Sequence, residues 1–294
     1  MNDILGQVID KLQYYYTGIA RLGSLEIFIL TGVIFMTLAW LFPSRKQPLV
    51  REGMLTDALY WFLGGPLLYG WAGHMIFYGL AYAAMFLGIY TLENVNNINE
   101  GLPPVSTWPV LVQAFVMLLA TDLIQYWMHR MFHTMKFWRW HAIHHSPTHV
   151  DWLTSARFHP VNIIIYSTFV NTLVYMAGFS PEAFAILVPF NIIYSPLVHA
   201  NVNWSYGPFR YFLASPNFHR WHHTYIEEGG NKNFAPTFPF IDMLFGTYYD
   251  PQGKRPEVFG IPGNPVSDDI FDQLIYPFRR KKKTIKTEAT DGKV

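Results

Sequence analysis

The sequence predicts an all-α protein, in the form of a multi-span transmembrane helical bundle with a cytoplasmic, histidine-rich helical cap. Hydrophobic residues make up 51% of the 294 residues and charged residues only 14%, whereas soluble domains contain about 25% charged residues. Five or six apolar stretches approach the roughly 17–25 residues that a helix needs to cross a bilayer. Aromatic residues reach 18%, which is typical of proteins with Trp and Tyr at membrane interfaces.

The apolar stretches give the expected helices in chain order. They cover approximately residues 25–42, 55–92, 109–128, 161–178 and 181–198. The second stretch is broken by Gly64-Gly65-Pro66 and contains His74, which we expect to be an interfacial or packed residue rather than a metal ligand. The last two stretches are joined by a turn at Phe179-Ser180 and form a transmembrane hairpin.

We expect three regions along the chain. Residues 1–108 form an N-terminal transmembrane region that does not read as a cleaved signal sequence. Residues 109–250 form a catalytic region that contains the transmembrane hairpin and nearly all of the histidines. Residues 251–294 form a polar tail with a basic run, Arg279–Lys283, and its end is expected to be disordered. The basic run is expected to face anionic lipid.

The distribution of charge predicts the orientation in the membrane, because cytoplasmic loops are enriched in Lys and Arg. The loop that contains Arg45, Lys46 and Arg51 should be cytoplasmic, and so should the basic histidine-rich segment. Residues 93–108 contain no Lys or Arg and should lie outside. A single net crossing by residues 55–92 satisfies these charges. The protein is thus expected in a bacterial inner membrane or an ER-type membrane, with its active site on the cytoplasmic side.

Composition also excludes several classes of function. The chain contains no cysteine, which excludes disulfides, thiolate-bound haem, iron–sulfur clusters and cysteine nucleophiles. The formal net charge is +1, so no overall field favours nucleic acid as a partner.

Three histidine boxes stand out as candidate metal ligands. The first box has the spacing H-x-x-x-H and the other two have the spacing H-x-x-H-H. Offsets of i, i+3 and i, i+4 are expected to place all imidazoles of a box on one helical face, where they can converge on a metal. Eight imidazoles exceed the needs of one ion, which favours two metals. Ligand type leaves iron, copper, zinc and nickel open. The boxes hold no carboxylate, which argues against zinc peptidases and carboxylate di-iron bundles. The box residues are His129, His133, His141, His144, His145, His219, His222 and His223.

Several other polar residues accompany the boxes. His199 ends the last apolar stretch and is favoured as a ninth ligand, whereas His149 is expected to be a solvated loop residue. His159 is left open between a ligand, a residue supporting the ligands and a residue at a helix start. Asp122 and Tyr126 share the face of His129, where Asp122 either accepts a histidine N–H or is only a helix-face carboxylate. Asp242 either supports the site in the same way or has a turn role.

The three histidine boxes, together with Asp122, Tyr126, His159 and His199, resemble the fatty acid hydroxylase / sterol desaturase superfamily of integral-membrane, non-haem di-iron oxidases. The resemblance covers residues 115–250 and ends with Asn233-Phe-Ala and Asp242-Met-Leu-Phe-Gly-Thr247. It implies that the boxes hold two Fe ions, that O2 is a co-substrate and that a lipid reaches the site from the bilayer. It also implies a separate electron donor of the ferredoxin or cytochrome b5 type. Asn203 stands where some fatty acid hydroxylases have another histidine, which points to the sterol-desaturase-like branch.

The expected function is therefore that of a membrane-bound, O2-dependent di-iron oxidase. It would hydroxylate or desaturate a C–H bond of a sterol, carotenoid, fatty acyl or ether lipid. One alternative is a zinc-dependent membrane hydrolase, for which Glu227 or Glu228 would have to serve as the base. Another is a non-catalytic metal-binding or transport protein, although the histidines lie at the ends of the apolar stretches rather than within them.

Overall fold

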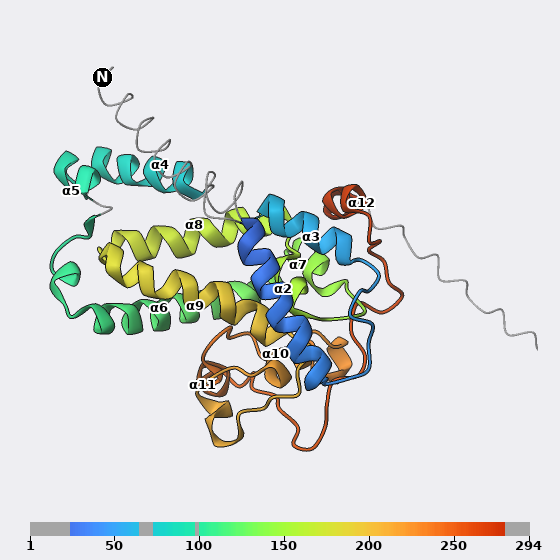
Figure 1. The fold of residues 1–294 in the computed structure, drawn as a ribbon. Helices are drawn as coiled ribbons and strands as arrows, with labels where there is room; N and C mark the ends of the chain where they lie inside the picture. Colours follow the sequence, from blue (N-terminus) through green and yellow to red (C-terminus); the bar gives the residue numbers. More distant parts are fainter. Residues whose placement is uncertain (1–23, 65–72, 98–99, 280–294) are drawn as a thin grey trace, which may run out of the picture.

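A computed structural model describes residues 24–64, 73–97 and 100–279 of the chain (Figure 1). In these ranges the regular secondary structure is helical, with two isolated β-bridges and no strand, so the prediction of an all-α fold is confirmed. The α-helices are α2 (Ser24–Leu41), α3 (Met54–Leu63), α4 (Gly73–Phe86), α5 (Leu92–Asn97), α6 (Val110–Phe132), α7 (Trp138–His145), α8 (Pro160–Met176), α9 (Pro181–His199), α10 (Pro216–His222), α11 (Pro239–Leu244) and α12 (Ile270–Ile275). The short 3-10 helices are η3 (Val105–Thr107), η4 (Trp152–Ala156), η5 (Gly207–Tyr211), η6 (Ile226–Glu228) and η7 (Tyr276–Phe278).

Two of the described helices, α6 and α9, are long and apolar enough to cross a membrane. Figure 1 shows α6, α8 and α9 side by side, and α4 lies along α8. Their shared core includes Met117, Phe132, Val174 and Leu187. The shorter apolar helices lie within α2 and α8. The positions of the apolar stretches thus correspond to helices, while the larger number of spans stays a prediction.

The starts of α6 and α9 are held together by one buried amide. The side-chain nitrogen of Gln113 donates to the carbonyl oxygens of Ser106 and Trp108, and its oxygen accepts the backbone N–H of Ser180. The turn before Ser180 needs Gly178, which has φ +82°. A Cβ at this position would lie 2.5 Å from the carbonyl oxygen of Leu102. The predicted turn between the two apolar stretches is therefore tightly packed.

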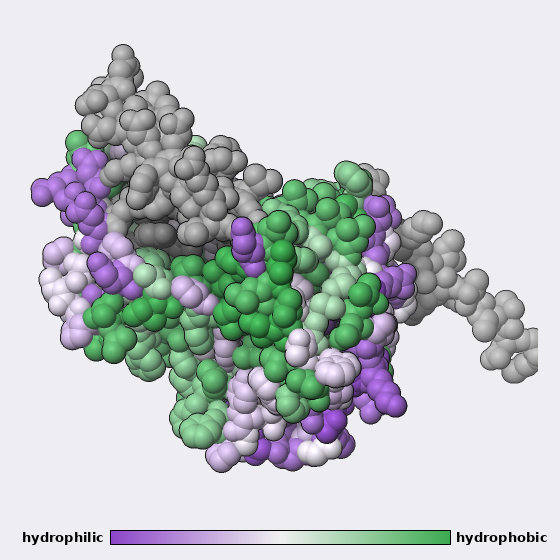
Figure 2. Space-filling view, viewed as in Figure 1, coloured by the Kyte–Doolittle hydropathy of each residue, from purple (hydrophilic) through white to green (hydrophobic). Residues whose placement is uncertain are grey.

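The outer faces of these helices are apolar. On α6, Leu111 is 71% exposed and Phe115 58% exposed. Large exposed apolar surfaces of this kind are unusual in proteins that are surrounded by water. Figure 2 shows hydrophobic residues over α2 and α3 and along α6 and α9, with hydrophilic residues gathered beyond both ends of this band. The pattern suits helices whose middle sections face lipid.

A buried ion network connects the N-terminal helices to the rest of the chain. Asp57 of α3 pairs with Arg51 and Arg157, and none of these three side chains is more than 1% exposed. Arg51 also pairs with Asp151, and Arg157 also pairs with Asp268, which precedes α12. Residues 251–279 thus pack back onto the fold. The part of the basic run from residue 280 onward lies outside the described residues.

Candidate metal centre

Nine buried or half-buried imidazoles lie at the C-terminal ends of α6 and α9, on α7 and α10, or directly after these helices. They form two groups, and within each group the ligand nitrogens lie within 4.8 Å of one another. The first group, which we call group A, consists of His129, His133, His141, His145 and His222. The second, group B, consists of His144, His199, His219 and His223. The eight box histidines and His199 are therefore all brought together.

The structure divides each H-x-x-H-H box between the two groups. His141 and His145 of α7 belong to group A and His144 to group B, whereas α10 gives His222 to group A and His219 and His223 to group B. The expectation that all three imidazoles of a box share one face is too simple. A helix turns about 100° per residue, so positions i+3 and i+4 lie on opposite sides of position i, about 100° apart.

Nitrogen–nitrogen distances within the groups match those of ligands on a common ion. The Nε2 atoms are 3.0 Å apart for His129 and His141 and 3.0 Å apart for His199 and His219. The corresponding distance is 3.3 Å for His219 and His223 and 3.4 Å for His144 and His199. Two imidazoles bound at about 2.1 Å are separated by roughly 3.0 Å at a right angle and 3.4 Å at the tetrahedral angle.

Hydrogen bonds on the opposite ring nitrogens define the tautomers. The Nδ1–H of His144 donates to the carbonyl of Arg157, and that of His199 donates to the carbonyl of Ser195. A carbonyl can only accept, so in the neutral rings both Nε2 atoms carry lone pairs. These two lone pairs face each other at 3.4 Å. Two acceptors cannot bond to each other, but both can bind one cation.

Burial keeps these rings neutral and ready to act as ligands. It lowers the pKa of His141, His144 and His145 well below the ordinary value for histidine, and the neighbouring imidazoles add to this effect. The Nε2 atoms of His133, His145 and His222 are buried and have no hydrogen-bond partner among the described residues. The donor set therefore fits metal ions. Among the described residues neither group contains a carboxylate.

The loop of residues 232–238 orients two ligands of group A. The Nδ1–H of His222 donates to the carbonyl of Lys232, and that of His129 donates to the carbonyl of Phe234. Asp242 fixes this loop by accepting the backbone N–H groups of Phe234 and Ala235. Such partners of ligand histidines set the orientation and basicity of the ring.

Asp122 and Tyr126 support the same loop from α6. The carboxylate of Asp122 accepts the backbone N–H groups of Thr237 and Phe238 at 2.7 and 2.8 Å. Of the two alternatives for Asp122, acceptance of a histidine N–H does not match these contacts. Tyr126 shares a hydrogen bond with the hydroxyl of Thr247, which in turn donates to Asp242. The two carboxylates therefore act on the ligands through backbone, not by direct contact.

His159 and His149 lie outside groups A and B. The Nδ1 atom of His159 accepts the backbone N–H of Val161, and its Nε2–H donates to the carbonyl of Leu274. These contacts correspond to the helix-start alternative. His149 hydrogen-bonds only to Thr148 within the described residues. The side chain of His74 lies outside what the structure describes.

One residue that orients a ligand was not singled out from the sequence. The amide oxygen of Asn162 accepts from Nδ1 of His141 at 2.9 Å, and both side chains are buried. Asn162 belongs to the first turn of α8, and its only signal is a polar residue at the start of an apolar stretch. The carbonyls of Arg157, Ser195, Lys232 and Phe234 give no signal in the sequence at all.

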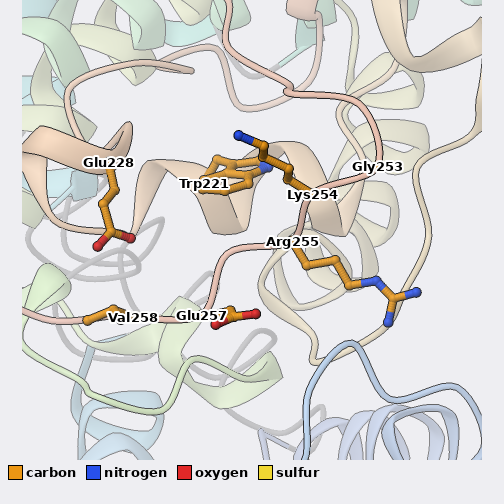
Figure 3. Close-up of a pocket in the computed structure, with 7 residues that line it drawn as sticks. All are labelled: Trp221, Glu228, Gly253, Lys254, Arg255, Glu257 and Val258. Carbon is orange, nitrogen blue, oxygen red and sulfur yellow. The ribbon is translucent and has the colours of Figure 1, made fainter.

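Glu227 and Glu228 lie away from the imidazoles. Both are exposed, and neither belongs to a histidine group. Figure 3 shows Glu228 at a cavity of about 600 Å³ that is also lined by Trp221, Lys254, Arg255 and Glu257. No histidine lines this cavity. The structure therefore gives no support to either glutamate as the base of a metal hydrolase.

The support from Asp242 leads to a prediction for metal retention. Replacing Asp242 with asparagine puts an NH2 group against the backbone donors of the loop, which should displace the Lys232 and Phe234 carbonyls. We expect metal affinity to fall by about 10–100-fold, as for other partners of ligand histidines. Competition with a chelator measures this directly. Asp269→Asn is the matched control, since Asp269 caps α12. Equal metal retention in both variants would contradict the assignment.

Comparison with known proteins finds a matching family and several relatives. Residues 114–247 match the sequence profile of a family described as fatty acid hydroxylase. The ornithine lipid hydroxylase OlsE of Rhizobium tropici is 29% identical over 175 residues, 59% of this chain and 53% of that protein. The alkylglycerol monooxygenase of Homo sapiens is 32% identical over 161 residues, 54% of this chain and 34% of that protein.

A very-long-chain aldehyde decarbonylase of Oryza sativa subsp. indica is 30% identical over 155 residues, 50% of this chain and 56% of that protein. The chain thus spans only about a third to just over half of the length of these relatives. No solved structure matches the chain. The matched region contains all nine imidazoles of groups A and B.

Proposed function

We propose that the protein is a membrane-bound oxidase that inserts oxygen into a C–H bond of a lipid, because residues 114–247 match the fatty acid hydroxylase family. Groups A and B would each hold one iron ion. Hydroxylation is favoured over desaturation because two of the relatives are named as a lipid hydroxylase and a monooxygenase. The substrate class would be a polar lipid with a long alkyl or acyl chain.

The observation that carries the proposal is the convergence of Nε2 lone pairs at two adjacent positions. Five imidazoles surround one position and four the other, and no described carboxylate takes part. The positions are neighbours, since the rings of His145 and His223 stack with their centroids 4.7 Å apart. Iron bound there would supply O2 activation strong enough to remove hydrogen from an unactivated C–H bond.

The protein itself would orient the ligands and exclude water. The carbonyls of Lys232, Phe234 and Arg157 hold three imidazoles with Nε2 directed to the metals. The rings of Phe234 and Phe158 cover them, with Phe158 stacked on His144 at 4.0 Å. Apolar walls of this kind keep reactive species from side reactions with solvent.

Electrons would come from a separate protein of the ferredoxin or cytochrome b5 type. The chain contains no cysteine that could hold an iron–sulfur cluster, and groups A and B consist of imidazoles alone. The centre would thus receive electrons from outside, on the cytoplasmic face that the basic loops predict.

The proposal is tested by metal analysis combined with lipid mass spectrometry. We expect two iron ions per chain in the purified protein. With a reductase system, 18O2 should place one labelled oxygen atom in a lipid extracted from the host membrane. Protein reconstituted with zinc should be inactive, because zinc has no redox chemistry. Turnover by the zinc form without O2 would overturn the proposal in favour of a hydrolase.

A further inference from the structure

We propose that residues 236–245, here called the α11 hairpin, insert into the hydrocarbon region of the bilayer beside α6. The acyl chains of lipids would then cover this part of the surface next to the metal centre. The inference rests on the proposed function in one respect, which is that α6 crosses a membrane.

The contacts of the α11 hairpin show how far it runs along α6. It begins next to Phe234, whose ring lies 5.7 Å from that of His129. Thr237 and Phe238 then reach Asp122, which precedes His129 by seven residues. At 1.5 Å per residue this is a descent of about 10 Å along the helix axis. The ring of Phe238 also lies 6.4 Å from that of Phe115, further still from the metal end.

The hairpin then returns towards the metal centre. After α11, the ring of Phe245 stacks on Tyr126 at 5.1 Å and meets Trp127 edge-on at 4.8 Å. The chain thus enters and leaves on the same side of α6. The helix α6 is apolar enough to cross a bilayer. The part of the hairpin furthest from the metal centre, near Phe238, therefore lies beside a section of α6 that should face lipid.

The exposed side chains of the hairpin are apolar. Leu244 is 74% exposed, Met243 49% and Phe245 38%. The charged residue of the hairpin, Asp242, is fully buried. The neighbouring η5 contacts α11 and adds the exposed ring of Phe209, and the residue after η5 adds the exposed ring of Phe212. In Figure 2 the hydrophobic colour continues from α6 and α9 onto this lower left part of the molecule.

Backbone that enters a bilayer must have its polar groups satisfied within the protein. Several backbone groups of the hairpin meet this requirement. Asp122 accepts the N–H groups of Thr237 and Phe238, and the carbonyl of Thr237 accepts from Ala214. Pro236 and Pro239 have no N–H to satisfy. This accounts for a buried carboxylate within an otherwise apolar helix, since it caps the backbone of a segment at the same depth.

Cationic side chains mark the open end of the hairpin. The guanidinium of Arg130 lies 5.6 Å from the ring of Trp127. The ammonium of Lys232 lies 3.5 Å from the carbonyl oxygen of Gly246. Trp, Lys and Arg are the residues that favour the headgroup region. The polar boundary of the membrane would therefore pass near Trp127 and Gly246, with Leu244 below it.

Single cysteine substitutions test the inference, because the natural chain has no cysteine. Leu244→Cys probes the hairpin, Leu111→Cys probes the exposed face of α6, and Val258→Cys probes an exposed apolar position at the cavity of Figure 3. Each variant is placed in lipid nanodiscs and treated with a membrane-impermeant maleimide. Only variants that keep the wild-type metal content are compared.

We expect Leu244→Cys and Leu111→Cys to react at least about tenfold more slowly than Val258→Cys, because a thiol in hydrocarbon does not ionise. All three should react equally after denaturation. If Leu111→Cys is protected and Leu244→Cys reacts as fast as Val258→Cys, the hairpin is in water and the inference fails while the span stands. If Leu111→Cys also reacts fast, α6 is not in lipid and the membrane part of the proposed function fails with it.

Discussion

Replacing His223 with alanine is expected to abolish lipid oxidation and to lower the metal content from two ions per chain to one. Group B would keep only three of its four imidazoles, so its ion would be held more weakly. Replacing His145, whose ring stacks on that of His223, leaves four imidazoles in group A. The second variant should therefore retain more metal. Both should lose activity by more than about 100-fold, the upper limit for residues that only support ligands.

Metal content by mass spectrometry and turnover with a defined electron donor check this expectation. His149→Ala is the matched control, because His149 belongs to neither group. It should keep two metals and wild-type turnover. Identical metal contents for the His145 and His223 variants would contradict the division into groups of five and four.

Replacing Asp57 with alanine is expected to lower the free energy of unfolding strongly. Asp57 is fully buried and pairs with both Arg51 and Arg157, whose side chains are also buried. Removing one partner from a buried ion pair costs about 3–5 kcal/mol, because the remaining charge is left without compensation. Here two guanidinium groups lose a partner at once, and each keeps one carboxylate, that of Asp151 or Asp268. The protein should unfold at a much lower temperature, or fail to accumulate.

Thermal unfolding of the detergent-solubilised protein measures this effect. Asp272→Ala provides the comparison, since the pair of Asp272 with Arg279 is exposed and exposed pairs contribute little. Its unfolding temperature should equal that of the wild type. An unchanged unfolding temperature in the Asp57 variant would show that the network does not stabilise the fold.

The helical fold and the gathering of histidines could both be predicted from the sequence for clear physical reasons. Apolar stretches of membrane length have few structural options, because each backbone polar group must be satisfied within the helix. Repeated i, i+3 and i, i+4 histidines are rare without a metal to bind. The sequence also indicated His199, since it ends an apolar stretch at the same predicted face.

Most partners of the imidazoles could not be predicted, because they are close in space and distant in sequence. Asn162 follows His141 by 21 residues, and Phe234 follows His129 by 105. Four of the contacts use backbone carbonyls, which every residue possesses. The sequence left two alternatives open for each of Asp122 and Asp242, and only the structure shows their contacts. Each carboxylate binds backbone N–H groups in a loop whose path depends on the whole fold.

The assignment of each histidine to a group also required the structure. Helical spacing shows which imidazoles are near each other on one helix. It does not show which neighbour from another helix each imidazole meets. His222 of α10 joins the α6 pair, whereas His219 and His223 join His199 of α9.

The buried ion network has a consequence for how this fold can be divided. Arg157 lies within the region that matches the family, but Asp57 precedes that region and Asp268 follows it. A protein made of residues 109–250 alone would bury this guanidinium with neither carboxylate. The region that matches the family is therefore not expected to fold without these two segments. Any fusion or chimera that contains the matched region therefore has to include the segments that carry Asp57 and Asp268.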